Sequence, residues 1–105
     1  MLALFLKHVG YEVITANSAN RALEVAKDRH VDLIISDIGM PGMNGYELAE
    51  KLRSLNDYHS TPLIAVTGYT EYDDRGRSLR AGFDAHLTKP INPSQLLELV
   101  GRLLR

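Results

Sequence analysis

The chain has 105 residues, which suits a single domain. Its 45% hydrophobic and 24% charged residues exclude disorder and a collagen-like repeat, and its longest apolar run, residues 1–6, is far shorter than the roughly 20 residues that cross a bilayer. The absence of cysteine excludes disulfides and thiolate metal sites, and a net charge of −1 provides no basic field to attract nucleic acid.

The first predicted elements in chain order are a helix, a strand and a second helix, over residues 1–9, 11–16 and 19–29. Apolar residues recur at helical spacing in the first helix, and Gly10 follows it as a stop. Either Asn17 or Ser18 is suited to cap the second helix. Because no capping residue precedes the first helix, we expect the chain to begin inside an element.

Residues 33–36 form a short apolar run with two isoleucines, which is typical of a strand covered on both faces. The run ends at Asp37. Asn44 and Glu47 are three residues apart and predict a capping box for a helix that reaches about residue 55. The segment between strand and helix is a predicted loop marked by Gly39, Pro41, Gly42 and Gly45.

The second half of the chain continues the alternation of strands and helices. Strands are predicted over residues 63–67 and 83–88, with a helix of weak intrinsic propensity over residues 72–81 between them. Asn92 and Pro93 begin a final helix. Its predicted core positions are Leu96, Leu97, Val100, Leu103 and Leu104. Helices that alternate with short β-branched strands indicate an α/β layered fold with a mainly parallel sheet.

Three polar side chains lie at the carboxyl ends of three predicted strands: Asp37, Thr67 and Lys89. Ligands gather at this edge of an open α/β sheet. A carboxylate there can be the nucleophile that forms an aspartyl-phosphate, while a hydroxyl donates to a phosphoryl oxygen and an ammonium balances its charge. Singly, the three have ordinary interpretations as a turn residue, a β-forming residue and a solvated loop lysine. Their coincidence favours a phosphoryl site.

The sequence around these residues is more specific than their positions. The three segments are SDIGMPGMNG at residues 36–45, AVTG at residues 65–68 and AGFDAHLTKP at residues 81–90. They resemble, in order and spacing, the phosphoacceptor loop, switch-threonine strand and closing segment of the receiver domains of bacterial two-component response regulators and hybrid histidine kinases. The resemblance covers essentially residues 1–105 and implies one receiver domain with a flavodoxin-like (CheY-like) α/β fold, a doubly wound parallel sheet.

The resemblance also implies roles for the polar residues. Asp37 would accept a phosphoryl group from a histidine kinase or phosphotransfer protein, and Thr67 and Lys89 would contact that group. Mg²⁺ would be held by the Asp37 carboxylate and the backbone carbonyl of Gly39. The chain would not be an enzyme beyond self-catalysed phosphoryl transfer and dephosphorylation at Asp37.

Further implications concern signalling. His86 lies where the family commonly carries a switch aromatic, and a half-buried strand histidine without a signalling role is the equal alternative. The resemblance implies a cis Lys89–Pro90 peptide bond. It implies a cytoplasmic protein that switches a partner surface or output domain, with no nucleic acid as direct partner and no membrane insertion.

The sequence departs from the family at its beginning. Receiver domains usually open with a hydrophobic strand that ends in an acidic pair, which supplies further contacts to magnesium. We therefore expect an N-terminally truncated receiver domain of four strands and five helices, with weakened Mg²⁺ binding. In the family's sheet order, 2-1-3-4-5, the absent strand is central. Residues 11–16 are then expected to pair with residues 33–36, to remain loosely docked or to find a second chain.

Other classes with similar sheets fit less well. A haloacid-dehalogenase-type phosphatase needs a second Asp two residues after the first, where this chain has Gly39. A dinucleotide-binding domain needs a G-x-G-x-x-G segment, which the sequence lacks. The alternative that stays open is a non-phosphorylated receiver-like protein-interaction module or an inactive fragment, which the missing acidic pair favours. Retention of Asp37, Thr67 and Lys89 favours the phosphoacceptor.

Overall fold

A computed structural model describes residues 2–38, 44–68 and 80–104. Its elements are α1 (Leu2–His8), α2 (Ala19–Asp28), β1 (Ile34–Asp37), α3 (Gly45–Arg53), the 3₁₀ helix η1 (Asn56–Tyr58), β2 (Leu63–Thr67), β3 (Ala85–Thr88) and α5 (Pro93–Leu103). Residues 80–81 are helical, and the rest of the helix predicted over residues 72–81 lies outside the described ranges. Within those ranges, no helix is long and apolar enough to cross a membrane.

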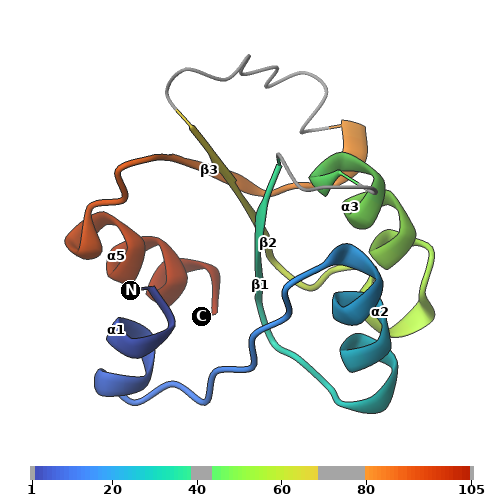
Figure 1. The fold of residues 1–105 in the computed structure, drawn as a ribbon, viewed down its shortest axis with the longest axis horizontal. Helices are drawn as coiled ribbons and strands as arrows, with labels where there is room; N and C mark the ends of the chain where they lie inside the picture. The colour runs from blue at the N-terminus through green and yellow to red at the C-terminus, as the bar shows by residue number, and fades with distance from the viewer. Residues whose placement is uncertain (1, 39–43, 69–79, 105) are drawn as a thin grey trace.

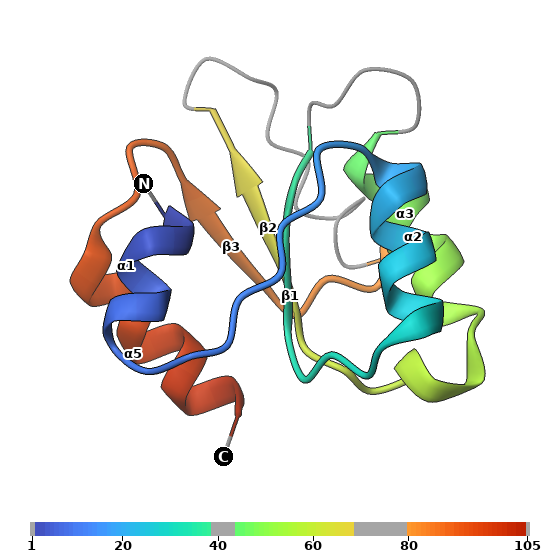
Figure 2. The same cartoon turned by 60° about the horizontal axis from the view of Figure 1, so that its bottom comes forward.

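The three strands form one parallel sheet in the order β1-β2-β3, covered on both faces by helices. Helices α2 and α3 lie on one face, and α1 and α5 lie on the other (Figures 1 and 2). Leu63 and Ala65 of β2 pack into the first layer, whereas Ile64 packs into the second. Because side chains alternate along a strand, a strand between two helix layers is apolar at every position. The predicted doubly wound parallel α/β fold is confirmed.

Side-chain caps start the helices where the sequence predicts them. The side chain of Ser18, one of two candidates, accepts a hydrogen bond from the backbone N–H of Arg21 at 3.1 Å. Asn44 and Glu47 form the predicted capping box. Asn92 caps α5, with Pro93 as its first residue. These contacts satisfy N–H groups that a helix leaves unpaired in its first turn.

The predicted strand over residues 11–16 is wrong. Those residues belong to no strand, and the described residues hold three strands instead of the expected four. The segment passes beside β1 on its way from α1 to α2 (Figure 2). Within the described part of the chain, this segment makes one backbone hydrogen bond, from the N–H of Tyr11 to the carbonyl of Leu6 at 3.1 Å. β-branched residues favour an extended backbone, but a strand also needs a neighbouring strand at hydrogen-bonding distance. Residues 11–16 pair with none of the described strands.

Two residues predicted to be in the core, one within α5 and one at its C-terminal cap, are exposed. Leu97 and Leu104, predicted to be in the core, are 37% and 40% exposed. Leu96 and Val100 are buried, because they lie one helical turn apart on the face toward the sheet. Leu97 is rotated by about 100° from Leu96 and therefore lies at the border of the apolar face.

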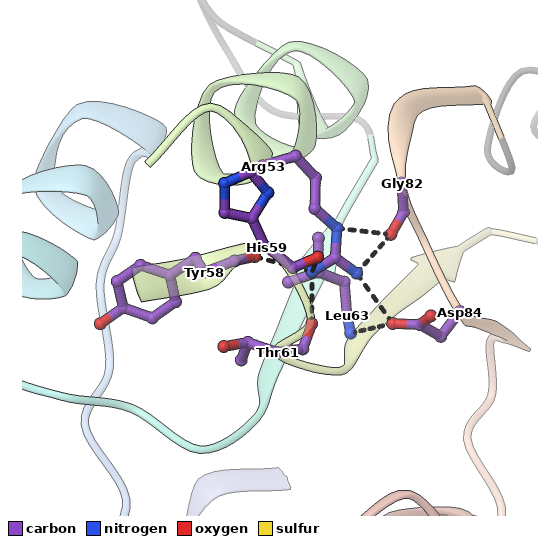
Figure 3. Close-up of polar contacts among 7 residues, drawn as sticks. All are labelled: Arg53, Tyr58, His59, Thr61, Leu63, Gly82 and Asp84. Atoms are coloured by element: carbon purple, nitrogen blue, oxygen red, sulfur yellow. Dashed lines mark hydrogen bonds and ion pairs between the residues drawn. The ribbon is translucent and has the colours of Figure 1, made fainter. Parts of the chain in front are cut away.

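Arg53, the last residue of α3, connects three segments that are distant in sequence (Figure 3). Its Nε and Nη2 donate to the carbonyl of Gly82 at 3.1 and 2.7 Å. Its Nη2 also pairs with Asp84 Oδ2 at 2.9 Å, and the same oxygen accepts from the N–H of Leu63, the first residue of β2. The remaining carbonyls that accept from Nη1 belong to Tyr58, His59 and Thr61.

Gly82 makes this approach possible. Its φ is +112°, a conformation that other residues rarely adopt, and an added Cβ would lie 2.7 Å from Cγ of Arg53. The guanidinium therefore packs directly on the turn that precedes β3. Its planar set of donors satisfies carbonyls of both the η1–β2 connection and this turn.

Replacing Arg53 should destabilise the fold more than other charge-conserving changes. An ammonium cannot reach all these carbonyls, so we expect Arg53→Lys to lower the free energy of unfolding by about 2–4 kcal/mol. Urea denaturation followed by circular dichroism measures the change. Arg102→Lys, at an exposed position in the last turn of α5, is the matched control and should change it by less than about 0.5 kcal/mol. Equal effects of the two variants would contradict this role.

Candidate functional site

The parallel register brings the ends of the three strands to one edge of the sheet. Asp37 is the last residue of β1 and lies opposite Val66, and Thr67 lies opposite Thr88. Lys89 follows directly after β3. All three strands run toward the same edge (Figure 2). Asp37 and Lys89 are 52 positions apart in the sequence. The strand register brings them, together with Thr67, to one site.

Asp37 and Lys89 form an ion pair at this edge. The distance from Lys89 Nζ to Asp37 Oδ1 is 3.0 Å, and each side chain is 50% exposed. The backbone N–H of Lys89 donates to the carbonyl of Thr67 at 2.7 Å, and the Lys89–Pro90 peptide bond is cis, as the resemblance implies. A half-exposed pair contributes about 1 kcal/mol or less. Both groups therefore remain accessible to a ligand at little energetic cost.

Thr67 presents a hydroxyl that the described structure leaves unpaired. The residue is 1% exposed, and its Oγ1 has no hydrogen-bond partner among the residues described. A buried hydroxyl without a partner costs about 1–3 kcal/mol. Its position, at the carboxyl end of β2 between the strands that end in Asp37 and lead to Lys89, suits a donor to a bound oxygen atom.

Ser36 and Gly45, which the sequence did not mark as site residues, hold the backbone around Asp37. Ser36 is buried, and its hydroxyl donates to the Asp37 carbonyl at 3.0 Å. Gly45 begins α3, and its N–H donates to the carbonyl of Ile38 at 2.9 Å. An added Cβ on Gly45 would lie 2.5 Å from the Asp37 carbonyl oxygen. The Asn-Gly dipeptide at this point signals a turn, but only the fold shows that the turn packs against Asp37.

The remaining predicted site residues are His86, which lies within β3, and Gly39, which the structure does not describe. His86 is half-buried on β3, opposite Ala65 and three residues before Lys89. Gly39 lies outside the described residues, together with the loop over residues 40–43. The structure therefore brings Asp37, Thr67 and Lys89 to one edge and leaves the Gly39 carbonyl undescribed.

The described residues at this edge do not by themselves make a complete site for a divalent cation. No group of three His, Cys, Asp or Glu side chains in the described ranges is placed to hold a metal ion. Asp37 supplies the carboxylate here, and it is paired with an ammonium. Magnesium prefers six oxygen ligands in octahedral geometry, so the described side chains supply only part of such a site.

Curated relatives share the sequence over nearly its whole length. A 14.6 kDa protein encoded in the sodA1 3′ region of Leptolyngbya boryana is 38% identical over 100 residues, which are 95% of this chain and 76% of that protein. The sensor histidine kinase RcsC of Escherichia coli is 37% identical over 91 residues, which are 87% of this chain and 9% of the kinase. The chain thus corresponds to a small part of that kinase, and it spans less than half of several transcriptional regulators that it also matches.

Solved structures share the fold. The chemotaxis response regulator CheY4 of Vibrio cholerae superposes with a TM-score of 0.91 at 36% identity, over 99% of this chain and 87% of that chain. The receiver domain of the sensor histidine kinase PA1611 of Pseudomonas aeruginosa has a TM-score of 0.88 at 26% identity, over 98% and 84% of the two chains. That structure contains a magnesium ion coordinated in its active-site cleft.

A family model also matches this chain. The model, described as the response regulator receiver domain, matches residues 1–101. This match agrees with the parallel sheet between two helix layers. The chain belongs to the receiver domain family of two-component response regulators.

Proposed function

We propose that this chain acts as the phosphoacceptor of a two-component phosphorelay, with Asp37 taking a phosphoryl group from a phosphohistidine. The supporting observation is the buried Thr67 hydroxyl, which lacks a partner among the described residues at the edge where Asp37 and Lys89 form an ion pair. A phosphoryl oxygen bound there would accept a hydrogen bond from Thr67 and pair with the Lys89 ammonium. Those contacts would satisfy the buried Thr67 hydroxyl, which no described residue satisfies.

The proposed step is an in-line transfer between two nucleophiles. A carboxylate oxygen of Asp37 attacks phosphorus while the P–N bond of phosphohistidine breaks, and the electron pair of that bond stays on the imidazole nitrogen. Lys89 then pairs with the phosphoryl oxygens, because its half-exposed contact with Asp37 is weak enough to rearrange. The chain therefore catalyses transfer to itself, and later hydrolysis of the acyl phosphate, without turnover of a separate substrate.

Thr67 and His86 are the residues proposed to carry the change to a partner surface. Thr67 lies beside the phosphoryl position, and His86 lies on the neighbouring strand opposite Ala65. A shift of Thr67 toward the phosphoryl group would change the space available to the ring of His86, which is half-buried. The proposed donor is a histidine kinase or phosphotransfer protein in the cytoplasm, and the proposed receiver of the signal is an output domain or partner protein.

Magnesium binding by this chain is proposed to be weak. The described edge supplies one carboxylate, so we expect a dissociation constant of about 1 mM or weaker. Isothermal titration calorimetry with MgCl₂ measures it, and Asp37→Asn should remove the remaining heat of binding. Asp57→Asn, at an exposed position in η1, should not. Micromolar binding would show that residues outside the described ranges complete the site.

Incubation with acetyl phosphate and magnesium tests phosphorylation directly. We expect intact-mass spectrometry to detect one phosphoryl adduct, at low yield because a single carboxylate is available for the metal. The adduct should be absent from Asp37→Asn and retained in Asp57→Asn. No adduct from a chain that circular dichroism shows to be folded would instead support a non-phosphorylated interaction module, which the poor metal fit favours.

Thr67→Val separates the effect of the hydroxyl on the stability of the fold from its effect on the yield of phosphoryl adduct. Valine removes the unpaired hydroxyl and keeps the branched shape, so the free energy of unfolding should stay unchanged or rise by up to about 2 kcal/mol. The yield of phosphoryl adduct should fall about tenfold, because one donor to the phosphoryl oxygen is lost. Thr88→Val, its exposed register partner, should leave the yield unchanged. A destabilised Thr67→Val would show that the hydroxyl has a structural partner.

A further inference from the structure

Asp84 lies directly before β3 and bonds both backbone groups of Leu63, the first residue of β2. Its own N–H donates to the Leu63 carbonyl at 2.8 Å, and its Oδ2 accepts from the Leu63 N–H at 2.9 Å (Figure 3). β3 begins one residue later, at Ala85, which lies opposite Ile64. Because the bonds of a parallel ladder join an N–H to a carbonyl, the carboxylate here takes the place of a strand carbonyl. Asp84 thus ties the start of β3 to one residue of β2.

The carboxylate of Asp84 is itself held by Arg53. The Nη2 atom of Arg53 pairs with the same Oδ2 at 2.9 Å, and the guanidinium is anchored on the carbonyl of Gly82. The side chain of Asp84 is 44% exposed and that of Arg53 is 19% exposed. A carboxylate so exposed can adopt several rotamers in water. The contact with the more buried guanidinium selects the rotamer that reaches the N–H of Leu63.

The apolar pattern of β3 does not fix its register alone. Ala85 and Leu87 pack into the layer of α1 and α5, but both are only partly buried. A slip of one residue would turn them to the opposite layer, whereas a slip of two would keep them on the same face. A slip of two would move Lys89 along the sheet by about 7 Å. It would break the contact between Lys89 Nζ and Asp37 Oδ1, which are 3.0 Å apart.

We propose that Asp84 is a positioning residue for Lys89. By fixing the register of β3 against β2, it places the Lys89 ammonium beside the carboxylate of Asp37. The chemical consequence rests on the proposed function, in which Lys89 pairs with a phosphoryl group on Asp37. A slip of two residues is excluded because the residues that it would bring opposite Leu63 carry no carboxylate; they are Gly82 and His86.

The helix α3 contacts the strands of both members of the ion pair. At its start, Gly45 packs so closely that an added Cβ would lie 2.5 Å from the carbonyl oxygen of Asp37. At its end, Arg53 holds Asp84. Nine residues of helical backbone therefore connect the position of Asp37 to the start of the strand that leads to Lys89. The separation of carboxylate and ammonium is set by this helix as well as by the sheet.

Amide hydrogen exchange measured by NMR tests the positioning role without phosphorylation. In Asp84→Ala, exchange at Lys89, whose N–H bonds to the end of β2, should rise by about tenfold or more. Exchange at Ile38, whose N–H bonds to β2 at the same edge, should change by less than about threefold, because that bond does not depend on β3. Asp84→Asn keeps an acceptor oxygen and should stay close to the unmodified chain. Asp28→Ala, which removes an exposed carboxylate at the end of α2, should change neither amide.

A double-mutant cycle connects this result to the proposed chemistry. The yield of phosphoryl adduct from acetyl phosphate should fall by about threefold or more in Asp84→Ala and in Lys89→Ala, and the double variant should fall no further than Lys89→Ala. Effects that multiply in the double variant would show that Asp84 acts independently of Lys89, and would overturn the proposal. If the unmodified chain forms no adduct, the phosphoacceptor function fails, and the exchange comparison still decides the role of Asp84.

Two exchange results would also overturn the proposal. Equal increases at Lys89 and Ile38 in Asp84→Ala would report a general loss of stability, and unchanged exchange at Lys89 would show that the register does not depend on the carboxylate. Asp84→Glu is the second variant if alanine prevents folding. It keeps the charge but moves the carboxylate by one methylene, so exchange should rise by about threefold or more at Lys89 and stay unchanged at Ile38.

Discussion

β2 is hydrogen-bonded on both edges and buried at every residue, and the positions of the other elements depend on it. Its pairing with β1 sets the place of Asp37, and its pairing with β3 sets the place of Lys89. Its alternating side chains divide the core between two helix layers. Because a shift of one residue would move every side chain of the strand to the opposite face, the register is strongly specified. The candidate site is a direct consequence of that register.

The site combines one weak contact with one unsatisfied group. The Asp37–Lys89 pair is half exposed, so a phosphoryl group could replace it at little cost. The Thr67 hydroxyl is buried, and no described residue pairs with it. Fixed, rigid donors suit phosphoryl transfer because the protein contributes mainly position and charge. Ser36 and Gly45 serve the same end by holding the backbone on either side of Asp37.

Much of the molecule could be predicted from local sequence. Asn44 with Glu47 and Asn92 with Pro93 start helices because a cap is satisfied within one helical turn. The positive φ angles of Gly10 and Gly82 likewise follow from local backbone chemistry. The segments around Asp37, Thr67 and Lys89 resemble those of the receiver domain family, and the family match confirms that resemblance. That the three residues share one edge was predictable because parallel strands bring their carboxyl ends together.

Other features were decided only by the tertiary structure. Residues 11–16 have the composition of a strand but form none, because a strand exists only beside a partner edge. The contacts of Arg53 are mostly with backbone carbonyls, which carry no side-chain signal in a sequence, so its role depends on how distant segments approach each other. The sequence by itself therefore determined the helix caps, the strand ends and the chemistry placed there. The tertiary structure decided which extended segments pair, because hydrogen bonds between distant strands depend on what lies beside each one.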